Sequence, residues 1–277
     1  MQPRTVGGGR NGGNLQVTKA HSKRVITSEA VRPLTTQTEK AWNQWLAGLI
    51  DGNGCLFISK HGFAACEIAM GIRDKHALNQ VKQKFGGSIK LRSGSNSINY
   101  RLHHKEGIIY LISRINGHIR HSTRRIQLQQ LCQHFSIDYV QPDPLSTDSA
   151  WFAGFFDANG TLRLAAQSKH PQLYICVTNK NKGDVTLFEA AFGGCCYYDK
   201  TQNGYYTWSI RDRSEILKFL AYFKTFPCRS SKKARLHLIP RYFHFVEMRP
   251  LVGVAETTAF QSKAWNRFLD KWRSYSG

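Results

Sequence analysis

The stretch WLAGLIDGNG (Trp45–Gly54) decides how this chain is organised, because nearly the same ten residues return 106 positions later as WFAGFFDANG (Trp151–Gly160). Apolar residues fall at helical spacing in both copies, so each predicts a helix. We expect each helix to end at its Asn-Gly pair. Thr36 or Thr38 is the candidate N-cap of the first helix, and residues 146–148 hold the candidates for the second.

The sequence after each copy predicts the same order of elements. A hairpin, a short helix, a second hairpin and closing helices follow each motif, with Phe-Gly-Gly ending both short helices. In the first half we expect strands at 55–59, 64–70, 88–92 and 97–103 and a helix at 74–85. In the second half we expect strands at 161–167, 173–178, 195–200 and 204–211 and a helix at 182–192. The pattern predicts an α+β fold of two pseudo-symmetric αββαββα repeats.

Composition narrows the class of partner. The chain has 39 Lys and Arg against 18 Asp and Glu, a formal charge of +21, which indicates a polyanionic partner. It has no run of about 18 apolar residues and no strongly basic amphipathic helix, so nucleic acid is favoured over a membrane surface. The seven cysteines are odd in number and lack CxxC spacing, which favours a reducing compartment and no zinc site.

Both ends of the chain differ from the repeats. Residues 1–40 hold seven basic residues and two acids around a glycine-rich start, and we expect them to lack regular structure. Two interpretations remain open: a basic arm along a phosphate backbone, or an organelle transit segment. We divide the chain into this tail, a first repeat at 41–142, a second at 143–250 and a C-terminal helical extension at 251–277. The extension carries large apolar residues at packing intervals, so we expect it to dock, on this body or on another chain.

One hairpin of the first half separates apolar from charged side chains. Strand alternation places Ile89, Leu91, Ile98, Tyr100 and Leu102 on one face, and Lys90, Arg92, Asn99, Arg101 and His103 on the other. The charged face fits a nucleic-acid groove or backbone. The alternative is a half-buried strand pair with a solvated side, and the net charge favours the first interpretation.

At residues 46–54 the chain resembles the LAGLIDADG family of homing endonucleases and intron maturases, with seven of the nine motif letters identical. The resemblance covers roughly residues 40–245. It implies a saddle of antiparallel sheets built by one chain, so no homodimer is needed. Ala47 and Gly48, with Ala153 and Gly154, have almost no side chain, so the two motif helices can meet closely at a seam.

In the family, the eighth motif residue of each copy is an acid that binds divalent metal for phosphodiester cleavage. Here those positions hold Asn53 and Asn159. Losing both charges removes several kcal/mol of transition-state stabilisation, roughly a thousandfold or more in rate. The sixth motif residues, Asp51 and Asp157, lie two positions away on a helix and so should face away from the metal position. We therefore predict no catalytic residue and no metal ligand; Mg²⁺ enters only if the chain is an active endonuclease.

Three explanations of the two asparagines stay open: a lineage that stopped cutting, an engineered inactive variant, or Asn-Gly pairs that deamidate. Asn keeps the shape of Asp and tolerates an unusual φ angle before glycine. The first explanation is favoured, because an engineered variant does not explain the long, native-looking tail at residues 1–40.

Basic side chains near the family's cleavage centre usually hold the scissile phosphate. By similarity Arg124, Arg125, Lys232 and Lys233 are the candidates here, with ordinary solvated charge as the alternative. His103 and His104 are not a metal pair, because neighbours on a strand point in opposite directions. The full set of predicted nucleic-acid contacts is Lys90, Arg92, Arg101, His103, Arg124, Arg125, Arg163, Arg211, Lys232 and Lys233.

Two functions follow. The first is a catalytically inactive nucleic-acid binder, with RNA favoured over DNA: an organellar scaffold that is either a structural rRNA-binding component of a mitochondrial ribosome or an intron maturase. The alternative is an intron-encoded homing endonuclease that makes metal-dependent double-strand breaks in DNA. We expect the mitochondrion, with the chloroplast as the alternative, a possible place in a large ribonucleoprotein, and no membrane partner.

Overall fold

The computed structural model describes residues 28–166, 171–201, 204–248 and 255–275. Residues 1–36 and 37–277 form separate units. Of the first, only residues 28–36, the start of helix α1, are described, and the rest of the predicted tail lies outside the described residues. The part of the second unit that holds the two repeats, up to residue 248, is called the body below. None of the helices described here is long and apolar enough to cross a bilayer.

Two repeats of the same layout make up the body. The first contains α1 (Ser28–Asn53), β1 (Gly54–Ile58), β2 (Ala64–Gly71), η1 (Ile72–Asp74), α2 (Lys75–Phe85), β3 (Ser88–Leu91), β4 (Ser97–Leu102), α3 (Lys105–Ile115) and α4 (Ser122–His134). The second contains α5 (Trp151–Asn159), β5 (Gly160–Ala165), β6 (Gln172–Asn179), α6 (Gly183–Phe192), β7 (Cys195–Asp199), β8 (Tyr205–Ile210), α7 (Arg213–Thr225), α8 (Lys232–Leu236) and α9 (Ile239–Met248). The α+β class and the repeated order are confirmed.

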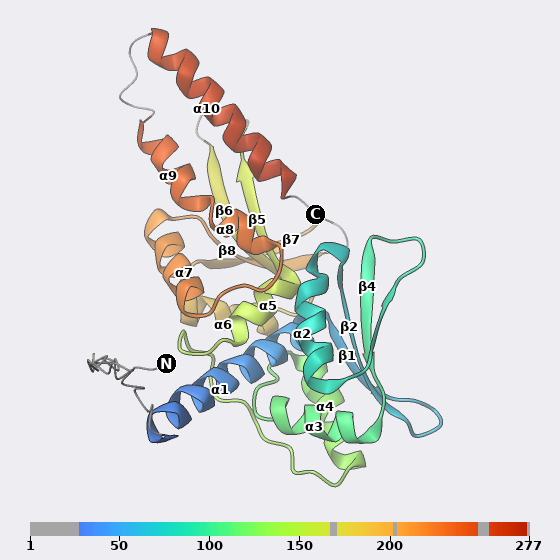
Figure 1. Cartoon of the computed structure of the whole chain (residues 1–277). Helices are drawn as coiled ribbons and strands as arrows, with labels where there is room; N and C mark the ends of the chain where they lie inside the picture. The colour runs from blue at the N-terminus through green and yellow to red at the C-terminus, as the bar shows by residue number, and fades with distance from the viewer. Residues whose placement is uncertain (1–27, 167–170, 202–203, 249–254, 276–277) are drawn as a thin grey trace, which may run out of the picture. The chain divides into compact units, whose positions relative to one another are not determined.

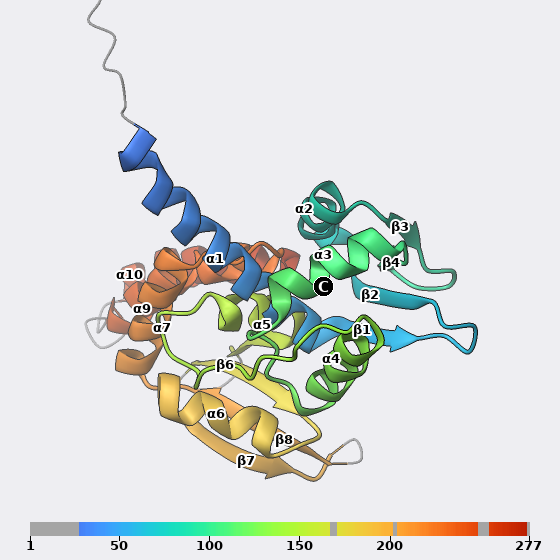
Figure 2. The same ribbon diagram turned by 90° about the horizontal axis from the view of Figure 1, so that it is seen from below.

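Each repeat forms one antiparallel sheet of four strands, ordered β1-β2-β4-β3 in the first and β5-β6-β8-β7 in the second. Figure 1 and Figure 2 show α2 and α3 against the first sheet and α6 against the second. One hydrophobic cluster runs through both halves. The helices therefore bury one face of each sheet and leave the other available to a partner.

The first motif helix starts earlier than the sequence predicts. Helix α1 runs from Ser28 through Thr36 and Thr38, so neither threonine caps it and residues 28–40 are not without structure. The cap prediction for α5 is also wrong. The N-cap is Ala150, whose side chain makes no capping hydrogen bond, and the N–H of Trp151 donates to Ser149 Oγ at 3.2 Å.

Both motif helices end at Asn-Gly, as predicted, but the reason is not an unusual φ. Among the described residues, the non-glycine residue with a positive φ is Ser136, and Gly160 has an ordinary φ of −67°. Glycine is needed for space instead. A Cβ at Gly54 would lie 2.7 Å from the Ile50 oxygen, and one at Gly160 would lie 2.1 Å from the Phe156 ring.

The seam between the repeats has the close contact that the small motif residues predict. A Cβ on Gly48 would lie 1.9 Å from the Trp151 oxygen, and one on Gly154 would lie 1.8 Å from the Trp45 oxygen. Figure 1 and Figure 2 both show α1 and α5 next to each other here. The backbones meet with no room for a methyl group on either side.

The first-half hairpin follows its predicted alternation with one exception. Ile98, Tyr100 and Leu102 are buried, whereas Leu91 is 65% exposed. Leu91 pairs with Ile98 at the last position of β3, an edge strand. Strand alternation predicts the face of a residue but not the extent of the core, which ends before Leu91.

The C-terminal extension docks on the body of its own chain. Helix α10 (Ala255–Ser274) buries Phe268 and Trp272. The Phe268 ring lies 5.7 Å from that of Phe245 on α9, and Arg235 Nε on α8 donates to the Trp272 carbonyl at 3.2 Å. The sequence leaves open whether the extension docks on this body or on another chain, and in the structure it packs on this body.

We expect Gly48→Ala to destabilise the protein by about 3 kcal/mol or more, because the added methyl group must push two helix backbones apart. Gly183→Ala is the matched control, since a Cβ there has no atom within 4 Å and alanine favours a helix. Urea unfolding of both variants measures the difference. Equal stability of Gly48→Ala and the control would show that the seam is not tightly packed.

Candidate nucleic-acid interface

The sixth motif acids hold the seam together by a reciprocal pair of hydrogen bonds. Trp151 Nε1 donates to Asp51 Oδ2 at 2.8 Å, and Trp45 Nε1 donates to Asp157 Oδ2 at 2.8 Å. Both carboxyl groups are buried, with exposures of 0% and 2%. Each motif copy thus binds the tryptophan that begins the other copy, and a buried carboxylate needs such donors.

The segments before the closing helices supply further donors to the same carboxyls. The Arg120 N–H donates to Asp51 Oδ2 at 2.6 Å, and the Arg229 N–H donates to Asp157 Oδ2 at 2.9 Å. Ser230 gives Asp157 Oδ1 two more bonds, from its N–H at 3.0 Å and its hydroxyl at 2.5 Å. The two acids are therefore buried and hydrogen-bonded inside the protein.

The two arginines of these segments also cover the seam tryptophans. The Arg120 guanidinium lies 5.6 Å from the Trp151 ring centre, and that of Arg229 lies 4.5 Å from the Trp45 ring. These distances fit cation–π contact. Sequence reasoning missed all four residues. The available signal was that both motif copies begin with Trp.

A second reciprocal pair ties the closing helix of each half to the other half. The Ser122 N–H and hydroxyl donate to the two carboxyl oxygens of Asp184 at 2.9 and 2.8 Å, and the Ser231 N–H donates to Asp74 Oδ1 at 2.6 Å. Asp74 and Asp184 lie at matching places, at the starts of α2 and α6. Each half therefore holds the closing helix of the other.

The two motif acids are not equivalent in their partners. Both oxygens of Asp157 accept hydrogen bonds, whereas Asp51 Oδ1 is buried without a hydrogen bond of normal geometry. Burial raises the pKa of Asp51 to about 7, against the lowering effects of the Arg120 and Trp151 hydrogen bonds and of the nearby His121 backbone N–H. The Asp51 side is thus the less well satisfied half of the seam.

The helix tips carry amides where a metal site needs charge. Asn159 Nδ2 donates to the Gly52 carbonyl at 3.3 Å, and Asn53 is half-buried at the end of α1. Within the described ranges, no three His, Cys, Asp or Glu side chains are grouped to hold a metal ion. Hard divalent cations favour charged oxygen ligands. The residues at these tips therefore do not fit the paired metal site that the family resemblance implies.

Lys232, predicted to contact phosphate, points into the protein instead. Its ammonium donates to the carbonyls of Phe156, Asp157 and Ala158 at 2.9, 2.8 and 2.9 Å, which caps the C-terminal end of α5. Burial lowers its pKa to about 8. Its three donors are used, so the predicted phosphate contact is wrong for Lys232. Lys233, its exposed neighbour, stays a prediction.

The remaining predicted contacts on the first repeat are available to different degrees. Lys90, Arg92 and His103 are exposed. Arg101 is also exposed, but its Nε lies 3.3 Å from Glu67 Oε1 on the next strand. An exposed ion pair is worth at most about 1 kcal/mol, so a phosphate can compete for Arg101.

Arg124 and Arg125 are half-buried on α4. Arg124 Nη1 donates to Gln127 at 3.2 Å, and Arg125 Nη2 donates to Gln141 at 2.8 Å. The positive charge of Arg124 acts on Asp51, so this arginine faces the seam. Its predicted phosphate contact remains a prediction.

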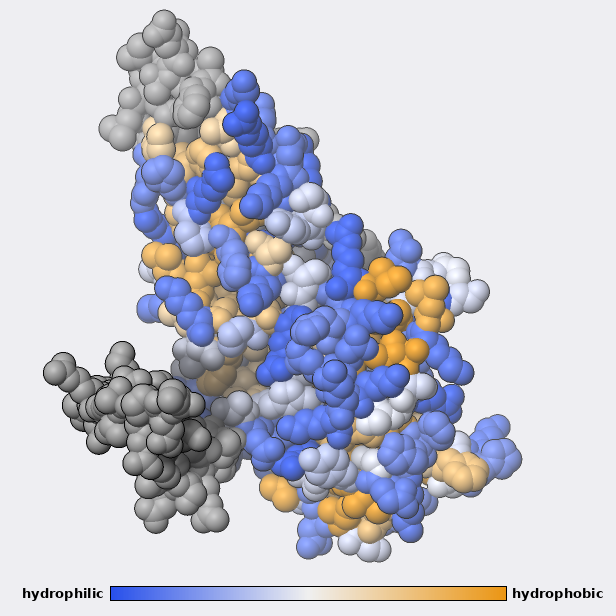
Figure 3. Space-filling view, viewed as in Figure 1, coloured by the Kyte–Doolittle hydropathy of each residue, from blue (hydrophilic) through white to orange (hydrophobic). Residues whose placement is uncertain are grey.

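Arg163 is exposed on β5 of the second sheet, and Arg211 is exposed directly after the end of β8. The exposed predicted residues therefore belong to both sheets. Figure 3 shows that hydrophilic residues cover much of one face of the body, including the region of α2, and much of α10. Such a surface suits a polyanion better than an apolar partner.

A family model described as LAGLIDADG endonuclease matches residues 46–135 and 152–243. The chain belongs to this family. Among curated relatives, "Intron-encoded RNA maturase bI4" of Saccharomyces cerevisiae is 44% identical over 236 residues, which cover 84% of this chain and 37% of that protein. "Intron-encoded DNA endonuclease ai2a" of Dictyostelium discoideum is 34% identical over 85% of this chain and 76% of its own length.

Solved structures share the fold. The LAGLIDADG homing endonuclease I-GzeII, solved in complex with its DNA target, matches with a TM-score of 0.57 and 17% identity over 85% of this chain and 99% of that one. The chain spans 37% and 40% of the length of two of its relatives, from Saccharomyces cerevisiae and Debaryomyces hansenii. Family membership and fold are thereby established together.

Replacing one motif acid at a time with its amide tests the two halves of the seam independently. Asp157→Asn places an NH₂ group where one carboxyl oxygen now accepts N–H or O–H donors, whereas the NH₂ of Asp51→Asn can occupy the position without a partner. We expect Asp157→Asn to lower the free energy of unfolding by about 2 kcal/mol more than Asp51→Asn. Urea denaturation at pH 7 checks this, and equal losses would contradict the assigned bonding.

Asp51 also makes stability depend on pH. Its pKa is about 7 in the folded protein and about 4 in an unfolded chain. Between about pH 4 and pH 7 the folded protein holds a proton that the unfolded chain has released, so the free energy of unfolding falls as pH rises, by up to about 4 kcal/mol. Asp51→Asn cannot titrate and should flatten this part of the curve. Unfolding curves at pH 5 and 7.5 test it; identical slopes in both proteins would refute it.

Proposed function

We propose that this chain is an intron-encoded LAGLIDADG protein that binds folded RNA without cutting nucleic acid, acting as an intron maturase in the mitochondrion. The observation that carries this proposal is the chemistry of the motif tips. Both eighth positions are amides, and both sixth-position acids accept buried hydrogen bonds across the seam. A tip without negative charge cannot concentrate the cations that phosphodiester cleavage needs.

The choice of RNA has its own support. The relative named as an RNA maturase is 44% identical over 84% of this chain, and the formal charge of +21 suits a long phosphate backbone. This relative favours the maturase over the ribosomal component, the other RNA scaffold that the sequence leaves open. The mitochondrial location belongs to the same proposal and is supported by the intron-encoded relatives.

A DNA endonuclease is the second candidate, because two Dictyostelium discoideum relatives named as intron-encoded DNA endonucleases are 34% and 33% identical. The two candidate functions require different chemistry at the ends of the motif helices. An endonuclease requires cations beside Asn53 and Asn159, whereas a maturase requires only that the binding surface be kept.

Cleavage of a pooled library of randomised duplex DNA targets with Mg²⁺, read by sequencing of the cut ends, separates the candidates. We expect the wild-type chain to cut at least about a thousandfold more slowly than Asn53→Asp/Asn159→Asp, which restores two charges at the tips. A folded RNA pool should bind both proteins, with an affinity that falls steeply as salt rises. Wild-type cutting as fast as that of the double variant would contradict the proposal.

A further inference from the structure

The open face of the second sheet carries side chains that the first sheet lacks. Arg163 on β5 lies opposite Tyr174 on β6 in the strand register, and Tyr197 on β7 is 44% exposed. Arg211 follows the end of β8, with its guanidinium 5.9 Å from the Tyr174 ring centre. Tyr174, Tyr197, Arg163 and Arg211 are called the tyrosine strip below.

Neighbouring polar groups act on both tyrosines of the strip. The Tyr174 hydroxyl donates to the side-chain carbonyl of Gln172, two residues earlier on the same strand, which fixes the direction of the ring. Burial raises the pKa of the Tyr197 phenol, and the charge of Arg163 opposes this rise. The guanidinium of Arg163 therefore lies within electrostatic reach of the Tyr197 ring, on the sheet face that also carries Tyr174.

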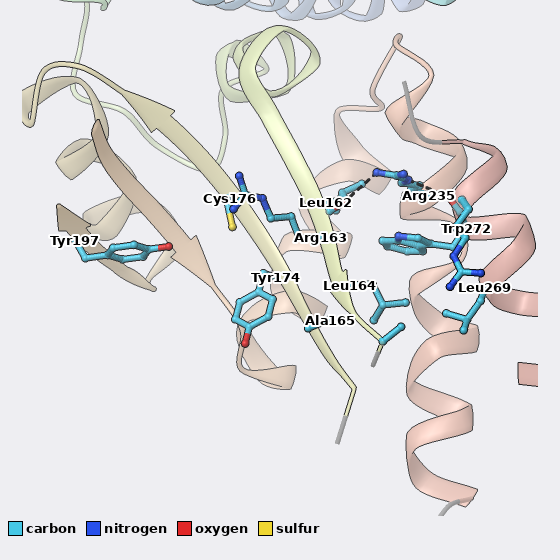
Figure 4. A pocket seen from close by; sticks show the side chains of 12 residues that line it. Leu162, Arg163, Leu164, Ala165, Tyr174, Cys176, Tyr197, Arg235, Leu269 and Trp272 are labelled. Atoms are coloured by element: carbon cyan, nitrogen blue, oxygen red, sulfur yellow. Dashed lines mark hydrogen bonds between the residues drawn. The ribbon is translucent and has the colours of Figure 1, made fainter. Parts of the chain in front are cut away.

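The strip opens into a cavity of about 770 Å³, bounded on one side by α8 and α10. Figure 4 shows Tyr174, Tyr197 and Arg163 on the strands, with Arg235, Leu269 and Trp272 across from them. None of the lining residues, all of which the structure describes, is acidic. A volume of this size can hold a small ligand, and its charge favours an anionic one.

Pseudo-symmetry shows that the strip belongs to the second sheet alone. Gly54 pairs with Ile68 in the first sheet as Gly160 pairs with Val177 in the second. Counting from these pairs, the first-sheet positions that match Tyr174 and Tyr197 hold Ala65 and Lys90. Each sheet also carries an acid. Glu67 at the centre of the first sheet binds Arg101 and Asn99. Asp199 at the end of β7 adds to the rise that burial causes in the pKa of Tyr197, while hydrogen bonds from Thr201 and then the charge of Arg163 lower the pKa of Asp199 itself.

We propose that the tyrosine strip binds unpaired nucleotides of an RNA strand, with bases stacked on Tyr174 and Tyr197 and phosphates held by Arg163 and Arg211. The choice of RNA rests on the proposed function. Flat rings beside guanidinium groups are the chemistry by which sheets bind single strands, because every base has a π-face and every linkage a phosphate. Bases stacked inside a duplex cannot reach a phenol ring on a sheet.

The difference between the sheets predicts that each binds a different part of the RNA. The first sheet offers Lys90 and Arg92, which contact phosphates of paired and unpaired strands alike. The second adds two phenol rings on which unpaired bases can stack, whereas the first has the half-buried ring of Phe57 at the position that matches Arg163. A folded RNA with a helix beside an unpaired segment therefore fits both sheets at once.

Fluorescence anisotropy of the full chain tests this with an unstructured CA-repeat RNA and a duplex DNA of equal length. The variant Tyr174→Ala/Tyr197→Lys installs the first-sheet residues at the matching positions. We expect it to lose about tenfold or more in affinity for the single-stranded RNA, and to keep its affinity for the duplex within about twofold. Tyr174→Phe/Tyr197→Phe keeps both rings and should bind the RNA like wild type.

Lys90→Ala/Arg92→Ala is the matched control on the first sheet and should weaken both ligands by similar factors. If the double tyrosine variant fails to fold, Tyr197→Lys alone carries the test at an exposed site. Unchanged binding of the CA-repeat RNA, or an equal loss for RNA and duplex, overturns the inference. Neither result depends on cleavage. The DNA-cutting assay tests the proposed function, and the anisotropy assay tests the tyrosine strip, so failure of one can be told from failure of the other.

Discussion

The close approach of α1 and α5 is the constraint on which the rest of the structure depends. Gly48 and Gly154 let two helix backbones meet where a methyl group would overlap a carbonyl oxygen. At that distance the tryptophan that begins each motif reaches the acid of the other motif. Two buried carboxyl groups then become part of the seam, because an acid without a hydrogen-bond donor is costly in such a place.

This arrangement separates the structural from the chemical part of the motif. The sixth-position acids, Asp51 and Asp157, hold the halves together whether or not the protein cuts nucleic acid. The eighth-position residues lie at the helix ends, where Asn159 needs only to reach the Gly52 carbonyl. A change from acid to amide at the tips therefore leaves the seam intact, so the fold does not depend on negative charge at the helix ends.

The sequence predicted what depends on local pattern and repetition. Two motif copies gave the αββαββα order, and Ala-Gly pairs gave the tight seam, since both follow from side-chain size and spacing. The capping of α5 by Lys232 and the Trp–Asp pairing could not be predicted, because each joins residues that are distant in sequence and meet only after packing. At the helix tips the sequence shows that Asn53 and Asn159 are neutral. It does not show which groups surround them, such as the Gly52 carbonyl that accepts a hydrogen bond from Asn159.

The most direct measurement of the central claim is the binding of Mn²⁺, a paramagnetic substitute for Mg²⁺, to the chain in complex with duplex DNA, followed by electron paramagnetic resonance. The account predicts that nucleic acid adds no tightly held Mn²⁺ to the wild-type chain beyond what the duplex binds by itself, since the helix tips carry no charge. Two strongly bound ions per chain, lost when Asn53 and Asn159 are replaced by alanine, would contradict it.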